Sequence, residues 1–139
     1  PLGRVNIHFG LIPGYLVEEP ATGSINFISQ NKLDDARETY MDLVKKAENS
    51  FIRDLAKLKL SYLNVDNVSF DQIQEDLSSL LESDNPLSLF AYEVLAMSAY
   101  KHGLYERGIE YLNTIIKSEK TTNGMFDRAQ MMLRVMDSK

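Results

Sequence analysis

Residues 92–115 read YEVLAMSAYKHGLYERGIEYLNTI, and this stretch decides the fold. In it a small residue is followed nine positions later by a bulky one. The same arrangement occurs three times along the chain, at intervals of about 35 residues, which is typical of stacked helix-turn-helix units. The pairs are Ser24 and Leu33, Ser61 and Phe70, and Ala96 and Tyr105. One such unit cannot bury its apolar face alone. The sequence therefore predicts an all-α fold of antiparallel helix pairs, stacked as a short right-handed solenoid.

Apolar residues recur at three- and four-residue spacing after residue 23, which predicts seven helices. They cover residues 24–30, 33–48, 51–63, 70–83, 87–102, 105–118 and 125–136. Ser50 and Ser69 are expected to be N-caps, and Gly103 is expected to end a helix with a left-handed residue. Four small residues are expected where helices cross closely, namely Ala36, Ser61, Ala96 and Gly108.

The first 22 residues have a different pattern. Apolar and polar residues alternate there, as in a strand, with Val5, Ile7, Phe9 and Leu11 on one side. Pro13-Gly14 is expected to form a turn, and we interpret residues 1–3 as an expression remnant. The chain thus divides into an extended segment, 1–22, and a helical domain, 23–139. We expect the extended segment to dock on an apolar helical surface or to pair with a second chain, which would make a homodimer.

The third copy of the pattern resembles a tetratricopeptide repeat. The resemblance rests on Tyr92-x-x-Leu95-Ala96-x-x-Ala99-Tyr100, Gly103-x-Tyr105 and Gly108-x-x-x-Leu112-x-x-Ile115. The chain departs from the family at Gly108, where alanine is usual, and at Lys57, where the middle copy would have an aromatic residue. The resemblance implies a protein-interaction module whose partner, a protein or peptide, binds in a concave groove.

A narrower resemblance concerns the helical domain of the ancillary subunit of the bacterial Sec translocon. It rests on Leu33-Asp34-Asp35-Ala36, Leu55-Ala56-Lys57-Leu58 and Arg128-Ala129-x-x-x-Leu133. It implies the periplasmic part of a membrane-anchored envelope protein that contacts the translocon and chaperones. A cytoplasmic scaffold with further repeats is the alternative location.

In the resembled fold, the first helix of each pair lines the groove. This register predicts a partner-binding groove of largely apolar and aromatic residues. Its members are Ile25, Ile28, Leu58, Tyr62, Val65, Phe90, Glu93, Met97, Tyr100 and Lys101.

Composition excludes several classes of function. The net charge of −5 and the scattered lysines argue against nucleic acid. There is no cysteine, no glycine-rich phosphate loop and no apolar run long enough to span a membrane. His8 and His102 lie far apart in the sequence, so they do not indicate a metal or acid–base site. We therefore expect no enzymatic activity, catalytic residue, cofactor or metal.

Two alternatives remain open at this point. A small-ligand-binding or enzymatic helical domain would use the tyrosines Tyr62, Tyr92, Tyr100 and Tyr111. A purely structural, oligomerising domain is the other. The cluster of Met131, Met132 and Met136 in the last helix could be packed in the core or form a docking face for a neighbour.

Overall fold

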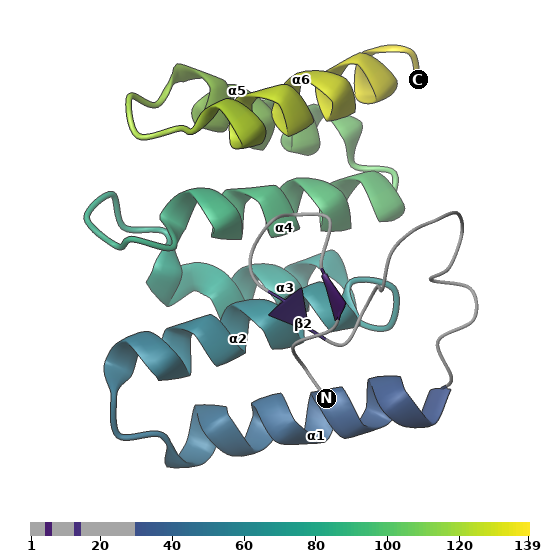
Figure 1. The fold of residues 1–139 in the computed structure, drawn as a ribbon. Helices are drawn as coiled ribbons and strands as arrows, with labels where there is room; N and C mark the ends of the chain where they lie inside the picture. Colours follow the sequence, from purple (N-terminus) through teal and green to yellow (C-terminus); the bar gives the residue numbers. More distant parts are fainter. Residues whose placement is uncertain (1–4, 7–12, 15–29) are drawn as a thin grey trace.

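The computed structural model describes residues 5–6, 13–14 and 30–139 (Figure 1). This part of the chain is all-α apart from one short pair of strands. The helices are α1 (Gln30–Lys46), α2 (Ser50–Asn64), α3 (Phe70–Leu77), α4 (Ser88–Lys101), α5 (Tyr105–Lys117) and α6 (Asn123–Asp137), with a 3₁₀ turn, η3 (Ser78–Leu80), after α3. They follow one another through the stack from α1 to α6, and consecutive helices contact each other.

Six of the seven predicted helices correspond to α1 to α6. The remaining one, 24–30, lies outside the described residues except for Gln30, which begins α1. The helix predicted over 70–83 is shorter than expected, because α3 ends at Leu77 and gives way to η3. Ser78 and Ser79 are weak helix formers, and the tighter turn leaves Leu80 fully buried.

The helix ends follow from local side chains. Ser69 caps α3, since its hydroxyl accepts a hydrogen bond from the Gln72 amide at 3.1 Å. Gly103 has a φ of 75° after α4, as its predicted role at a chain reversal requires. The prediction for Ser50 is wrong by one residue. Asn49 caps α2 instead: its backbone is extended, and its side-chain Oδ1 accepts a hydrogen bond from the Ile52 amide at 3.0 Å.

The short strands correct another expectation. β1 (Val5–Asn6) pairs antiparallel with β2 (Pro13–Gly14), with Val5 opposite Gly14. Pro13 and Gly14 thus form a strand and not the predicted turn. Proline is tolerated at the first position of a strand, where it need not donate to the ladder. Ile7, Phe9 and Leu11 of the predicted alternation lie outside the described residues, as does the question of what this segment docks on.

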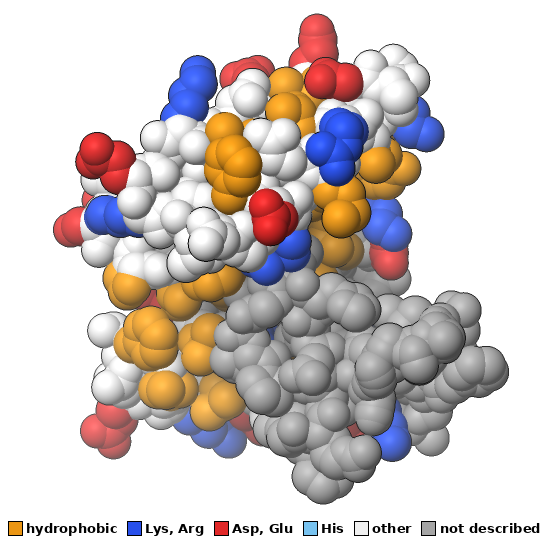
Figure 2. Space-filling view, turned by 45° about the horizontal axis from the view of Figure 1, so that its top comes forward, with side chains coloured by type: hydrophobic (Ala, Val, Ile, Leu, Met, Phe, Trp, Pro, Cys, Tyr) orange, Lys and Arg blue, Asp and Glu red, His pale blue; other side chains and the backbone are white. Residues whose placement is uncertain are grey.

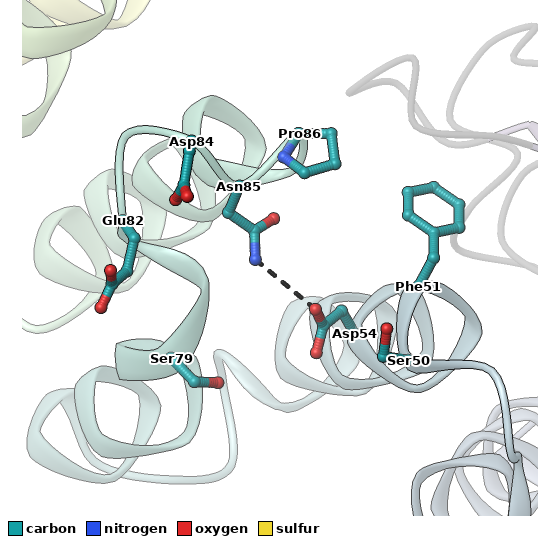
Figure 3. A pocket seen from close by; sticks show the side chains of 8 residues that line it. All are labelled: Ser50, Phe51, Asp54, Ser79, Glu82, Asp84, Asn85 and Pro86. Carbon is teal, nitrogen blue, oxygen red and sulfur yellow. Dashed lines mark hydrogen bonds between the residues drawn. The ribbon is translucent and has the colours of Figure 1, made fainter.

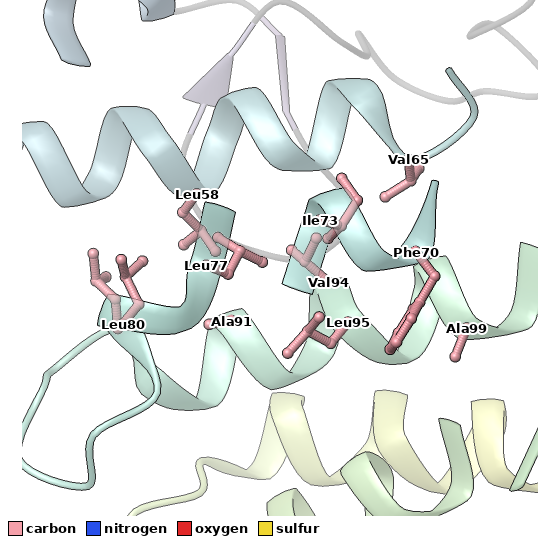
Figure 4. Close-up of a cluster of buried hydrophobic side chains, with 11 residues drawn as sticks. Leu58, Val65, Phe70, Ile73, Leu77, Leu80, Ala91, Val94, Leu95 and Ala99 are labelled. Atoms are coloured by element: carbon pink, nitrogen blue, oxygen red, sulfur yellow. The ribbon is translucent and has the colours of Figure 1, made fainter. Parts of the chain in front are cut away.

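The core consists of three apolar clusters between successive helices. The first joins α1 to α2 through Ala36, Tyr40 and Ala56. The second lies between α2, α3, η3 and α4, where leucines and isoleucine point inward from all sides (Figure 4). The third joins α4, α5 and α6 around Leu112 and Ile115. Each of the helices α2 to α5 packs against the helix before it and the helix after it.

The four predicted small residues are all buried. Gly108 on α5 shows why size matters there. A Cβ on this residue would lie 2.6 Å from the Met136 sulfur of α6 and 3.4 Å from Ala99 Cβ of α4. The missing side chain therefore lets α5 pack closely against both helices that flank it.

Candidate functional site

An apolar pocket lies where the last turns of α4 and α6 come together. It has a volume of about 320 Å³ and is lined by Met97, Tyr100, Lys101, Met131, Met132, Val135 and Met136. Four of the six methionines in the sequence are in this set. We call it the methionine pocket. Lys101 is its one charged member.

Local sequence explains how α6 reaches this position. Thr122 caps the start of α6, since its hydroxyl accepts a hydrogen bond from the Met125 amide at 3.2 Å. Met125 and Ala129 are buried against α4 and α5. The absent side chain at Gly108 admits Met136, which is 2% exposed, as a buried wall of the pocket. The sequence of α5 thus helps to shape a pocket that its own side chains do not line.

The outer wall of the pocket is exposed. Met131 is 58% exposed and Val135 is 42% exposed. Exposed apolar side chains that border a concave pocket indicate a binding surface more strongly than isolated ones do. Methionine is flexible and polarizable, so the shape of such a wall can adjust. On the face seen in Figure 2, hydrophobic side chains emerge in groups between charged ones.

A buried ion pair ties α4 to α6 beside this pocket. Glu93 on α4 is 1% exposed, and its two carboxylate oxygens accept hydrogen bonds from Arg128 Nε at 2.6 Å and Nη2 at 3.1 Å. Burial raises the pKa of Glu93, and the hydrogen bond and charge of Arg128 act in the opposite direction. The bidentate geometry fixes the orientation of α6 relative to α4, which in turn fixes the pocket wall.

The negative charge of Glu93 also acts on Tyr62, which lies on α2. Burial, together with the charges of Asp66 and Glu93, raises the pKa of Tyr62 to about 12. Its hydroxyl therefore stays protonated across the physiological range and is poorly suited to general acid–base chemistry.

The structure divides the predicted groove residues into three groups. Ile25 and Ile28 lie outside the described residues. Leu58 and Val65 are buried in the second core cluster, with Phe90 packed against it, and Glu93 and Tyr62 are in the buried environment described above. Met97, Tyr100 and Lys101 come together in the methionine pocket.

The residues from α6 were not part of the predicted groove. Met131, Met132 and Met136 were recognised only as a cluster with two possible roles, and Val135 was missed. A signal was present in the sequence, because residues 131 and 135 are one helical turn apart and so share a face. Met136 is buried and so belongs to the core, whereas Met131 is exposed, and its docking role stays a prediction.

The tyrosines of the enzyme alternative have different surroundings in the part of the chain that the structure describes. Tyr100 lines the methionine pocket. Tyr92 and Tyr111 contact each other instead, with ring centroids 5.7 Å apart, and Gln74 Nε2 donates to the Tyr111 hydroxyl at 3.1 Å.

A second, polar pocket of about 440 Å³ lies between the start of α2 and the segment before α4 (Figure 3). Asp54, Glu82 and Asp84 are among its lining residues, and Asn85 Nδ2 donates to Asp54 Oδ2 at 3.5 Å. Within residues 30–139 and the two strands, no three histidine, cysteine or carboxylate side chains are placed to hold a metal ion. His102 is not among the residues that line this pocket, and its Nδ1 lies 2.8 Å from the Ser98 carbonyl oxygen. Glu82 and Asp84 are exposed, and Asp54 is half-buried.

Comparison of the chain with protein-family models, curated proteins and solved structures gives no match. Of the helices that the structure describes, none combines the length and the apolar character that crossing a membrane requires.

Proposed function

We propose that this chain is a protein-interaction module of the tetratricopeptide type, in which stacked helix pairs present α2, α4 and α6 to a partner. The observation that carries the proposal is the methionine pocket. It combines a concave apolar wall, exposed flexible side chains and a position at the meeting point of two helices. Recognition of amphipathic segments by such apolar grooves is a recurrent mode of peptide binding.

The chemistry of the pocket supports a peptide over a small polar substrate. Small-molecule sites add several convergent polar groups to their apolar walls. Here Lys101 is the only charged lining residue, and it is already in contact with Asp66 at 3.2 Å. A site of this composition binds through the burial of apolar surface, which contributes about 25 cal/mol per Å², and it offers few polar groups for hydrogen bonds or catalysis.

The test uses two matched double variants. The pocket variant carries Met131→Gln and Val135→Gln, and the control variant carries Met41→Gln and Leu43→Gln on α1. All four residues are exposed, at 58%, 42%, 46% and 37%, so both variants should fold. A random peptide library is selected against the wild-type chain, and the affinities of the selected peptides are then measured for both variants.

We expect the selected peptides to contain bulky apolar residues and to lose about tenfold in affinity for the pocket variant, since central apolar anchors dominate such interfaces. Their affinity for the control variant should remain unchanged. Equal affinity for both variants and the wild type would mean that the methionine pocket is not the binding site.

A further inference from the structure

The dimensions of the methionine pocket limit what it can hold. The lining residues on α4 span 97–101 and those on α6 span 131–136. At 1.5 Å per residue the pocket is therefore roughly 6–8 Å long. An apolar cavity of about 150 Å³ holds a benzene molecule, and this pocket, at about 320 Å³, has about twice that volume. It thus accommodates two bulky side chains, spaced about one helical turn apart.

The charged side chains that contact the pocket are mostly cationic. Lys101 lines it, with its side chain 44% exposed. Lys139 lies over Tyr100, with Nζ 5.9 Å from the ring centroid. Asp66 forms an ion pair with Lys101, and the Asp66 side chain is 64% exposed. An exposed ion pair of this kind contributes at most about 1 kcal/mol, so a carboxylate of a partner can replace Asp66.

The helix dipoles and the net charge of the chain both repel an acidic partner, and both effects are smaller than the attraction of Lys101 and Lys139. The pocket is at the C-terminal ends of α4 and α6, where each helix dipole amounts to about half a negative charge. Lys101 and Lys139 carry full charges; Lys101 lines the pocket, and Lys139 lies over the ring of Tyr100 in its wall. The net charge of −5 acts over the whole chain and is screened beyond a Debye length of about 8 Å. The two lysines thus determine the sign of the electrostatic interaction with a partner at the pocket.

The same balance disfavours an anionic membrane as the occupant. A membrane presents a broad, uniformly negative surface to the whole face, so the chain's net charge of −5 opposes its approach. A short peptide reaches the pocket alone and meets the two lysines without the rest of the acidic surface.

We propose that the methionine pocket binds an acidic peptide segment that carries two bulky apolar side chains about one helical turn apart, with at least one carboxylate beside them. The apolar side chains enter between Met97 and Met131, and the carboxylate contacts Lys101 and Lys139. This inference rests on the proposed function and adds to it the chemistry of the partner.

The test uses two capped synthetic peptides with leucine at positions i and i+4. All remaining charged residues are glutamate in the acidic peptide and lysine in the basic peptide. Affinities are measured by fluorescence anisotropy for the wild type, for the double variant Lys101→Glu with Lys139→Glu, and for the control Lys45→Glu with Lys46→Glu on α1. Both double variants change the net charge equally.

We expect the wild type to bind the acidic peptide about tenfold more tightly than the basic one, the effect of one to two exposed ion pairs. The preference should reverse in the Lys101 and Lys139 variant and persist in the Lys45 and Lys46 control. Binding of the acidic peptide should also fall about tenfold in the pocket variant with Met131→Gln and Val135→Gln.

Other outcomes overturn the inference in distinguishable ways. If both peptides bind equally, or the basic one binds better, and both lose affinity in the pocket variant, the partner is not acidic but the proposed function stands. If the pocket variant binds as the wild type does, both proposals are wrong. If neither peptide binds, the inference fails, and the library selection decides on the function by itself.

Two further measurements cover the other possible occupants. Sedimentation of the wild type and the pocket variant tests a second copy of this chain, and a dimer that only the wild type forms would replace the acidic peptide with self-association. Flotation with phosphatidylserine vesicles tests a lipid surface. Vesicle binding that is lost with Lys101→Glu and Lys139→Glu would assign the pocket to an anionic membrane.

Discussion

Replacing Arg128 with methionine isolates the buried charge of Glu93. Methionine is unbranched and apolar, so the substitution removes the two hydrogen-bond donors and the positive charge that face the Glu93 carboxylate, which is 1% exposed. Breaking a buried ion pair by removing one partner costs about 3–5 kcal/mol. The Arg128 side chain is 26% exposed and Glu93 can take up a proton, so we expect a loss near the lower end, about 3 kcal/mol at neutral pH.

The pH dependence of this loss gives the sharper test. Burial already raises the pKa of Glu93 above its ordinary value of 4.5, and Arg128 opposes that rise. Without Arg128 the folded-state pKa rises further, so between 4.5 and that value the folded variant binds more protons than the unfolded chain. Stability in this window therefore increases as the pH falls. The difference between variant and wild type should shrink from about pH 7 to about pH 5.

The assay is urea unfolding followed by circular dichroism at both pH values, with Glu93→Gln as the control. The amide keeps the size of the side chain and removes the charge, and the partly exposed Arg128 can then turn to water. We expect this variant to lose about 1 kcal/mol, with little change between the two pH values. A penalty for Arg128→Met that stays constant or grows toward low pH would refute the reasoning.

Three further predictions follow from buried side chains. Ala96→Leu should lower stability by about 1–3 kcal/mol in thermal unfolding, because Ala96 is 0% exposed and packs in the cluster of α4, α5 and α6; an unchanged melting temperature would mean that the small-residue register is wrong. Ser98→Ala should raise stability by about 1 kcal/mol in urea unfolding, since the Ser98 hydroxyl oxygen is buried without a hydrogen-bond partner; a loss of stability would reveal a contact that this oxygen makes. Burial lowers the pKa of Lys59 to about 8 from 10.5, so the unfolded chain binds more protons between these values; the wild type should gain stability relative to Lys59→Met from pH 8 to pH 10.5, and a flat difference would contradict the shift.

The local features of the fold were accessible from the sequence. Helix periodicity depends on residues three and four positions apart, and the caps at Ser69 and Gly103 depend on their own backbone and side chains. The errors were local competitions: Asn49 displaced Ser50 as a cap, and η3 replaced the last turn of the helix after Leu77. Asparagine and serine are both suitable N-caps, and here the Asn49 side chain accepts from the Ile52 amide.

Only part of the candidate site could be predicted from the sequence. The repeat register placed Met97, Tyr100 and Lys101 on one helix face, and the structure keeps them together. The register had no means of adding the wall from α6, because the last helix was treated as an extra element and not as the partner of α4. Leu58 and Val65 share the register of the groove, yet neighbouring helices cover them. Periodicity specifies a face, whereas burial depends on what packs against that face.

The sequence by itself determined an all-α chain, the approximate helices and the small residues that let them cross. These follow from short-range geometry and from side-chain volume. The tertiary structure alone decided that Glu93 meets Arg128, which is 35 positions away, and that the last turns of α4 and α6 form the methionine pocket. The physical reason is that a pocket and a buried ion pair depend on distances between atoms of different helices. The close approach of α5 to Ala99 and Met136 at Gly108 is one such distance.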